Sequence, residues 1–273
     1  MANFRKQTVA ELEVYTGCAA CPPPPIACGS GVNPPGGSTG LYNLTFDAGQ
    51  TVSDVGAIVI YFNPAGIPDG IRVLYDGVYY NAVSSPTTGR IQSSSGVSDA
   101  FTFLGTVGNT CIPTLPNTTT YNYFDGFTGS TWDPGTPSTQ SVTINVGDAP
   151  LGGANQSSTL VIPKTSAAPS IVTIQVLGPC SSTAWGIEVD CPITLPSFTA
   201  SVNIAGSTSC TAAATTYYFA QHRLATNTTP IVTSWVFSNS NGSTVLTDGN
   251  YVMSDNNVIT VVSGVVTVVT ACS

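Results

Sequence analysis

The chain has 273 residues, only 7% of them charged, and a formal net charge of −8 with six lysines and arginines. So few basic side chains leave almost nothing to neutralise a phosphate backbone, and the composition therefore argues against nucleic-acid binding. No apolar run approaches the roughly 20 residues that a membrane helix requires, so we expect no membrane insertion.

The first forty residues differ in composition from the rest. Residues 10–14 alternate apolar and acidic side chains, and the stretch CAACPPPPIACGSGVNPPGGSTG follows. Four consecutive prolines favour an extended polyproline spacer, and the Gly/Ser run after them is flexible. We therefore interpret residues 1–40 as an N-terminal docking segment and tether outside any core. No apolar stretch follows the two basic residues near the start, so this segment does not resemble a secretory signal.

Period-two alternation begins after this segment. Residues 142–146, 185–190 and 198–204 alternate apolar with polar or small side chains, as half-buried strands do. GAIVIYFN, residues 56–63, and SIVTIQVLG, residues 170–178, are apolar on both faces, which predicts central strands covered on both sides. Turn signals such as YDG, DPG and TDG recur, and no segment of ten or more residues shows helical spacing.

Many short strands without helices predict an all-β protein. We expect an antiparallel β-sandwich body over residues 41–195 and a smaller C-terminal all-β module over residues 196–273. The boundary falls at CPITLPS, residues 191–197, where two prolines follow a completed strand.

The sequence offers little for catalysis. An activated nucleophile needs a base, and the single histidine, His222, lies beside Arg223 in a setting typical of a surface or loop residue. A glycosidase needs two carboxyls roughly 5 to 9.5 Å apart. Asp69 and Asp76, in FNPAGIPDGIRVLYDG, are seven residues apart, which is roughly 23 Å along a strand. We predict that the protein is not an enzyme and has no catalytic residues.

The aspartates also raise the question of a calcium ion. Asp47, Asp69 and Asp76 could converge at one end of a sandwich, where carboxylates and carbonyls suit calcium. Alternatively, Asp before Gly is ordinary turn chemistry, in which the carboxylate accepts from turn amides and Gly takes a positive φ. Both hypotheses stay open at this point, and we expect no other cofactor.

Eight cysteines in a chain this poor in charge suggest an oxidising environment. Cys18-x-x-Cys21 with Cys28 offers three thiols but lacks the second C-x-x-C of a zinc ribbon, so disulfides or free thiols are the favoured interpretation there. Cys210 and Cys272 bracket the terminal module at its first and last strands. We predict that these two form a disulfide.

Aromatic residues crowd the stretch TYNYFDGFTGSTWDPG, which includes Tyr121, Tyr123 and Trp132. Exposed aromatic side chains in loops stack on sugars or anchor protein partners. The alternative is that they cover the open end of the sandwich core. We keep these three residues as candidates for a binding patch.

Three stretches resemble structural proteins of tailed bacteriophages that infect Bacteroidota, crAss-like phages included. IVIYFNPAGIPDGIRVLYDGV is similar to their pattern of an apolar strand, a Pro-Asp start and a second strand that ends at Asp-Gly. STLVIPKTSAAPSIVTIQVLGPCSSTAWGIEVDCP is similar to the second half of the same sandwich. SWVFSNSNGSTVLTDGNYVMSDNNVITVVSGVVTVVTAC resembles a module at the ends of such tail and fibre proteins. The sequence departs from the pattern at Gly70, where a larger, often basic residue is usual.

The resemblance implies a non-enzymatic virion component: a tail, fibre or surface decoration protein. Such a protein is assembled in the host cytoplasm and exposed on the released particle. The resemblance further implies docking on other virion proteins through residues 1–40, homo-oligomer formation, and contact with a glycan or protein of the host surface. The alternative is a secreted bacterial adhesin or carbohydrate-binding protein built from the same modules.

Overall fold

All regular elements among the described residues are strands, which confirms the predicted all-β class. The computed structural model describes residues 23–33, 39–51, 53–67, 69–85, 90–95, 101–104, 117–128, 131–132, 138–144, 158–201, 215–220, 226–232 and 234–272. Within these ranges, no helix is long and apolar enough to cross a membrane.

The larger sheet of the body contains nine strands. They are β1 (Ile26–Ala27), β3 (Gly40–Asp47), β5 (Asp69–Tyr75), β6 (Val78–Ser85), β7 (Arg90–Ser95), β8 (Thr102–Leu104), β9 (Asn117–Asp125), β12 (Ser138–Ile144) and β14 (Ile171–Gly178). Their order is β12-β9-β3-β14-β5-β6-β7, with β1 attached to β3 and β8 to β5. The pairs β1–β3 and β3–β9 are parallel and the others are antiparallel, so this sheet is mixed and not purely antiparallel as predicted.

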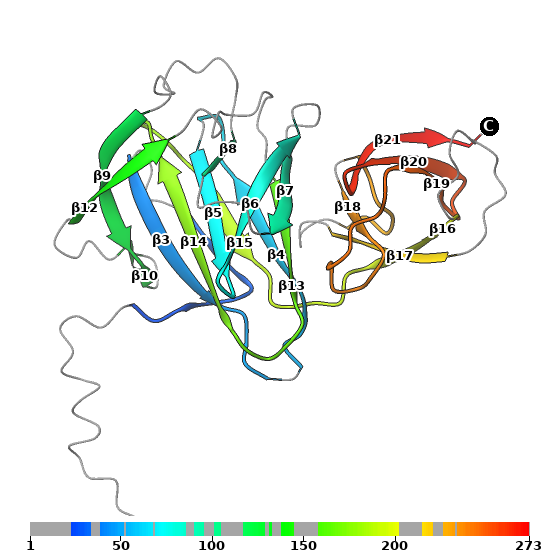
Figure 1. Ribbon diagram of the computed structural model, residues 1–273, viewed down its shortest axis with the longest axis horizontal. Coiled ribbons are helices and arrows are strands. Elements are labelled where there is room, and N and C mark those ends of the chain that lie inside the picture. Colours follow the sequence, from blue (N-terminus) through cyan, green and yellow to red (C-terminus); the bar gives the residue numbers. More distant parts are fainter. Residues whose placement is uncertain are drawn as a thin grey trace, which may run out of the picture.

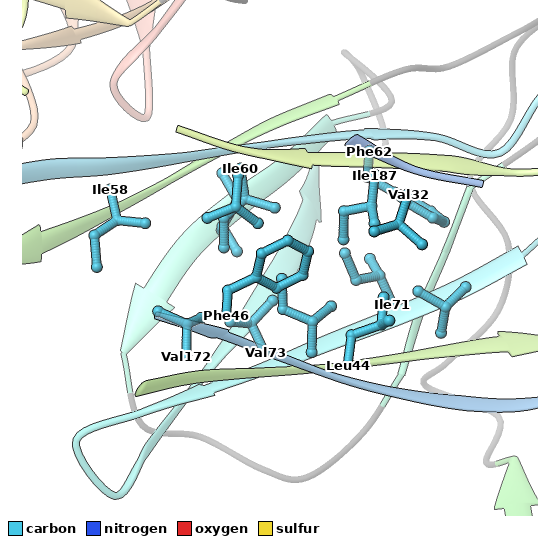
Figure 2. Packing of buried hydrophobic residues seen from close by; sticks show 14 of the residues in the cluster. Val32, Leu44, Phe46, Ile58, Ile60, Phe62, Ile71, Val73, Val172 and Ile187 are labelled. Atoms are coloured by element: carbon cyan, nitrogen blue, oxygen red, sulfur yellow. The ribbon is translucent and has the colours of Figure 1, made fainter. Parts of the chain in front are cut away.

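A second, four-stranded sheet packs face to face with the first (Figure 1). It contains β2 (Ser30–Val32), β4 (Gly56–Asn63), β13 (Ser158–Lys164) and β15 (Gly186–Val189) in the order β13-β4-β15-β2. Figure 2 shows how the apolar side chains of the two sheets point toward each other, including Ile58, Ile60 and Phe62 from β4. This shared core confirms the predicted β-sandwich.

Strand β4 is covered on both of its faces, as its sequence predicts. Ile58 and Ile60 lie in the sandwich core, whereas Ala57 and Val59 point away from it. The outward pair packs against Trp235 of the C-terminal module, so every side chain from Ala57 to Ile60 is buried. An apolar run on both faces of a strand is therefore explained here by two separate cores.

The C-terminal module is a six-stranded antiparallel sheet. Its strands are β16 (Ser197–Ala200), β17 (Thr215–Ala220), β18 (Trp235–Phe237), β19 (Gly249–Val252), β20 (Asn257–Val262) and β21 (Val265–Ala271), in the order β16-β17-β18-β21-β20-β19. A bridge between Ala200 and Met253 joins the two outer strands. The amide of Ser201 donates to the carbonyl of Val252 at 2.8 Å across the same seam. The sheet therefore closes on itself as a small barrel, which removes its free edges.

The body and the barrel are joined by direct contacts. The indole Nε1 of Trp235 donates to the carbonyl of Thr159 on β13 at 2.8 Å. The linker between β15 and β16 adds a bridge from Ile193 to Ala57 on β4. At this linker the chain leaves the four-stranded sheet of the body and enters the six-stranded sheet of the barrel, which is where the sequence places the boundary between the two modules.

The prediction that residues 1–40 form only a tether is wrong for residues 26–32. Strand β1 pairs with β3, β2 pairs with β15, and Val32 is 1% exposed in the sandwich core. Cys28 forms a disulfide with Cys191 across a sequence separation of 163 residues. These two strands are only two and three residues long and lie between Pro- and Gly-rich stretches, so the sequence shows no alternation that would indicate them. Residues 1–22 lie outside the described residues.

Candidate functional site

The outward face of the larger sheet carries a row of four polar side chains, one from each of four adjacent strands. Arg72 on β5, Gln175 on β14, Asn43 on β3 and Asp125 on β9 are register partners in that order. Their neighbours along each strand point to the opposite face and fill the core, since side chains alternate along a strand. We call these four residues the polar row.

Hydrogen bonds connect the polar row from end to end. Arg72 Nε donates to Gln175 Oε1 at 2.7 Å, and Gln175 Nε2 donates to Asn43 Oδ1 at 3.2 Å. Asn43 Nδ2 then donates to Asp125 Oδ1 at 2.8 Å, and the same oxygen accepts from the hydroxyl of Tyr123 at 3.3 Å. Every bond therefore runs in the same direction, from the Arg72 guanidinium through the two carboxamides to the Asp125 carboxylate. In such a chain each hydrogen bond polarises the next.

One side of the polar row is bordered by an apolar cluster on the same face. The cluster consists of Leu41, Phe101, Phe103, Tyr121, Val142, Ile144 and Leu177, with Tyr123 packed against it. The guanidinium carbon of Arg72 lies 4.4 Å from the ring centroid of Phe101, which is a cation–π contact. The other side of the row is more open: Leu74, Thr45 and Thr173 are half-buried and Ile171 is 37% exposed.

The cluster gives a physical reason for Gly70, the position at which the sequence departs from the phage pattern. A Cβ at Gly70 would lie 2.9 Å from two ring carbons of Phe103 and 3.2 Å from Phe101. Any larger residue would displace these rings, so a binding role for a side chain at this position does not apply to this protein.

The structure separates the three aromatic candidates. Tyr121 is 5% exposed and belongs to the apolar cluster, so its main role is packing. Tyr123 is half-buried beside Asp125, and burial, together with the Asp125 charge, raises its pKa to about 12. The Tyr123 hydroxyl therefore keeps its proton at ordinary pH and can donate a hydrogen bond. The backbone of Trp132 pairs with Phe127 in a small hairpin of β10 (Phe127–Thr128) and β11 (Thr131–Trp132), and its side chain lies outside the described residues.

The three aspartates proposed for calcium do not converge. Asp47 pairs with Ile171 and Asp76 follows Tyr75, which places both at the start of β14. Asp69 begins β5 beside the far end of β14, seven residues or roughly 23 Å away. Among the described residues, no group of three or more His, Cys, Asp and Glu side chains is arranged to hold a metal. The hypothesis of a calcium ion held jointly by these aspartates is therefore wrong.

Asp76 has the turn role that its sequence suggests, and Asp47 also holds a turn amide. Asp76 and Gly77 both have positive φ, 51° and 72°, and connect β5 to β6 through the register pair Tyr75 and Val78. This is the two-residue Asp-Gly hairpin turn. Asp47 Oδ1 accepts from the amide of Gly49 at 2.9 Å.

Asp69, in contrast, is a buried strand residue and not a turn cap. Its side chain is fully buried and accepts a hydrogen bond from the hydroxyl of Thr183, in the loop between β14 and β15. Its second oxygen, Oδ2, has no hydrogen-bond partner among the described residues. Burial raises the pKa of this carboxyl to about 8, and the bond from Thr183 opposes the rise.

The cysteine chemistry also differs from the zinc hypothesis. Cys28 is paired with Cys191, so it is not available as a metal ligand, and Cys18 and Cys21 lie outside the described residues. Cys272 is disulfide-bonded. Its predicted partner, Cys210, lies outside the described residues, so that pairing stays a prediction; His222 lies outside them as well.

A pocket of about 360 Å³ lies between the segment that contains β1 and β2 and the start of β10. It is lined by Pro24, Pro25, Ile26, Ala27, Ser30, Gly31, Val32 and Phe127. Ser30 supplies the one polar side chain of this lining, which gives a ligand little to orient it. The polar row, with its donors and acceptors in one line, is the stronger candidate site.

Sequence analysis did not identify the polar row. The interpretation of residues 170–178 as apolar on both faces overlooked Thr173 and Gln175, which alternate with core residues of β14. That alternation is the signal that indicates a partly exposed outer face. Comparison of the chain with protein-family models, curated proteins and solved structures gives no significant match. The phage resemblance therefore stays a prediction.

Proposed function

We propose that this protein is a non-enzymatic structural component of a phage virion, in the tail, a fibre or the surface decoration. It docks on other virion proteins through its N-terminal segment and displays the sandwich body and the barrel outward. The observation that carries the proposal is the Cys28–Cys191 disulfide, which ties the start of the described chain to the segment that directly follows β15, the last strand of the body. Because the docking segment continues into a part of the body that is held by this disulfide, a mechanical force on the segment acts on the whole sandwich and not on a single strand.

The disulfide also suits a particle that persists outside cells. Closing a loop of this size lowers the entropy of the unfolded chain, which corresponds to about 5 kcal/mol in the chain-entropy model. Only 7% of the residues are charged, so little of the stability depends on ion pairs that salt would screen. Cross-linked, charge-poor β modules therefore support a long-lived extracellular role.

The end of the docking segment is fixed against the body. A Cβ at Gly126, whose φ is 107°, would lie 1.9 Å from Cγ of Pro23, so this proline and the chain at the end of β9 are in close contact. Residues 26–32 belong to the sandwich, so a deletion that tests docking must stop at residue 22 and not at residue 40.

The experiment is a deletion of residues 1–22 in the phage, with a second variant in which Gly and Ser replace them at equal length. We expect both proteins to keep the wild-type melting temperature and the Cys28–Cys191 disulfide, and to be missing from purified particles by mass spectrometry. Normal incorporation of either variant would contradict docking through this segment. Absence of the unmodified protein from purified particles would contradict the virion role itself.

A second candidate is a secreted bacterial adhesin or carbohydrate-binding protein. It is favoured by the redox state of the described cysteines: Cys28, Cys180, Cys191 and Cys272 are all disulfide-bonded. Structural disulfides persist in secreted proteins and are rare in the cytosol. Antibody labelling separates the two candidates, because an adhesin is found on cells or in medium from cultures that contain no phage.

A further inference from the structure

We infer that the polar row is a binding site for a neutral oligosaccharide that lies across strands β9, β3, β14 and β5. The inference deepens the proposed function, on which it rests, by naming the class of host-surface ligand. It follows from the spacing of the row, from its charge and from the two surfaces on either side of it.

The spacing of the polar row suits a repeating ligand. Adjacent strands of a sheet lie about 4.8 Å apart, so side chains in register on neighbouring strands repeat at that distance. One pyranose unit in an extended sugar chain has a similar length. A chain perpendicular to the strands therefore presents one sugar to each polar side chain, with hydroxyls that can donate to and accept from the carboxamides of Asn43 and Gln175.

The polar row offers hydrogen-bonding capacity toward solvent at its Asp125 end. Asp125 is exposed, and the bonds that it accepts from Asn43 and Tyr123 both go to Oδ1. A carboxylate oxygen has two lone pairs, so Oδ2 offers a strong acceptor for a pair of sugar hydroxyls. The bonds within the row hold Asn43 and Gln175 in place before a ligand arrives, which lowers the entropy cost of binding.

The charge of the row favours a neutral sugar over an acidic one. Arg72, its one cation, is bonded to Gln175 and stacked on Phe101. Asp125 presents a negative charge at the exposed end, and the chain carries a net charge of −8. A sulfate or uronic acid placed on this row would meet repulsion from both the local and the overall charge.

The surroundings of the polar row match the two kinds of surface that a sugar ring has. Tyr123 borders it from the apolar cluster and is half-buried, so the exposed part of its ring can pack against the C–H face of a sugar ring. Thr45 and Thr173 border it on the open half of the sheet and present hydroxyls. The polar row therefore lies at the border between the part of the sheet face that the apolar cluster covers and the part that is open to solvent.

The test is binding of the full chain to a printed array of neutral, sulfated and carboxylated oligosaccharides of four to six sugars. We expect binding to neutral oligosaccharides alone, weakened at least tenfold in Asn43→Ala and Asp125→Ala. Thr118→Ala is the matched control, because Thr118 is an exposed polar residue on the opposite face of β9, paired with Thr143. It is expected to bind as the wild type does.

A conservative variant keeps the result interpretable. Asp125→Asn preserves the size of an exposed side chain, so it is expected to fold like the wild type and still lose affinity. No binding to any neutral oligosaccharide, equal binding to acidic ones, or unchanged affinity in the Asn43 and Asp125 variants would each overturn the inference. Incorporation into particles without sugar binding counts against this inference alone, whereas sugar binding by a protein absent from particles counts against the virion role alone.

Discussion

The hydroxyl of Thr183 donates to the carboxyl of Asp69, although 114 positions separate the two residues along the chain. Asp69 is fully buried, and its carboxyl has a pKa of about 8 instead of the ordinary 3.8 because burial disfavours its charged form. Between these two values the folded protein holds a proton that the unfolded chain releases. Stability contributed by neutral Asp69 is therefore fully present below about pH 4 and is lost as the pH rises toward 8.

We predict that Asp69→Asn removes this pH dependence. The shift in pKa corresponds to about 6 kcal/mol between its two limits, at about 1.4 kcal/mol for each pH unit. Thermal unfolding of both proteins between pH 4 and pH 9 measures it, and the difference between their melting temperatures should grow in favour of the variant as the pH rises. Asp76→Asn, in an exposed hairpin turn, is the control and should follow the wild type. Parallel curves for wild type and Asp69→Asn would show that the carboxyl does not titrate in this range.

The sequence predicts features that depend on near neighbours along the chain. The Asp76-Gly77 turn follows from two adjacent residues, and the burial of β4 on both faces follows from one apolar run. The burial of Asp69 depends on a loop that is distant in sequence. The polar row likewise combines strands separated by 82 to 132 residues, and one of its pairings, β3 with β9, is parallel. No local period encodes such a relationship, because it is fixed by the order of strands in the sheet.

A second buried ionisable group, the side chain of Lys164, connects the loops at one end of the sandwich. The ammonium of Lys164 is fully buried and donates to the carbonyls of Asp54 at 2.6 Å, Ser166 at 2.8 Å and Ala167 at 2.8 Å. Burial lowers its pKa, and the nearby charges of Asp54 and Asp47 oppose this effect. All three donors of the ammonium are thus satisfied, so the cost of burying the charge is offset by hydrogen bonds.

Lys164→Met is expected to lower the free energy of unfolding by about 3 kcal/mol, because it keeps the apolar stem but leaves three carbonyls without this donor. Urea unfolding at neutral pH measures the change. Thr165→Met places the same side chain at the adjacent exposed position and should change stability by less than about 0.5 kcal/mol. Equal effects of the two substitutions would mean that the carbonyl cage contributes nothing to the fold.

Gly70→Arg tests the packing of the apolar cluster. The new side chain must displace Phe103 and Phe101, since a Cβ alone already lies 2.9 Å from Phe103. We expect a loss of about 1 to 3 kcal/mol in the free energy of unfolding, as in other overpacked sites. Gly66→Arg is the matched control, because a Cβ at Gly66 meets no atom within 4 Å. A Gly70→Arg protein as stable as Gly66→Arg would indicate that the cluster can open without cost.

The contact between the body and the barrel can be tested through Trp235. Trp235→Phe removes the bond from Nε1 to the carbonyl of Thr159 while keeping an aromatic ring in the shared core. Loss of one such hydrogen bond costs about 1 to 2 kcal/mol. Because the bond connects β18 to β13, we expect faster amide hydrogen exchange in both strands.

Tyr251→Phe is the matched control for this prediction. It removes the hydrogen bond from the Tyr251 hydroxyl to the carbonyl of Thr247 at 2.9 Å and the bond between that hydroxyl and Thr247 Oγ1 at 2.9 Å, but both residues belong to the barrel. Exchange should then increase in the barrel and stay unchanged in β13. If Trp235→Phe also leaves exchange in β13 unchanged, the body and the barrel do not stabilise each other through this bond. Their coupling must then come from the apolar contacts of the shared core and from the linker.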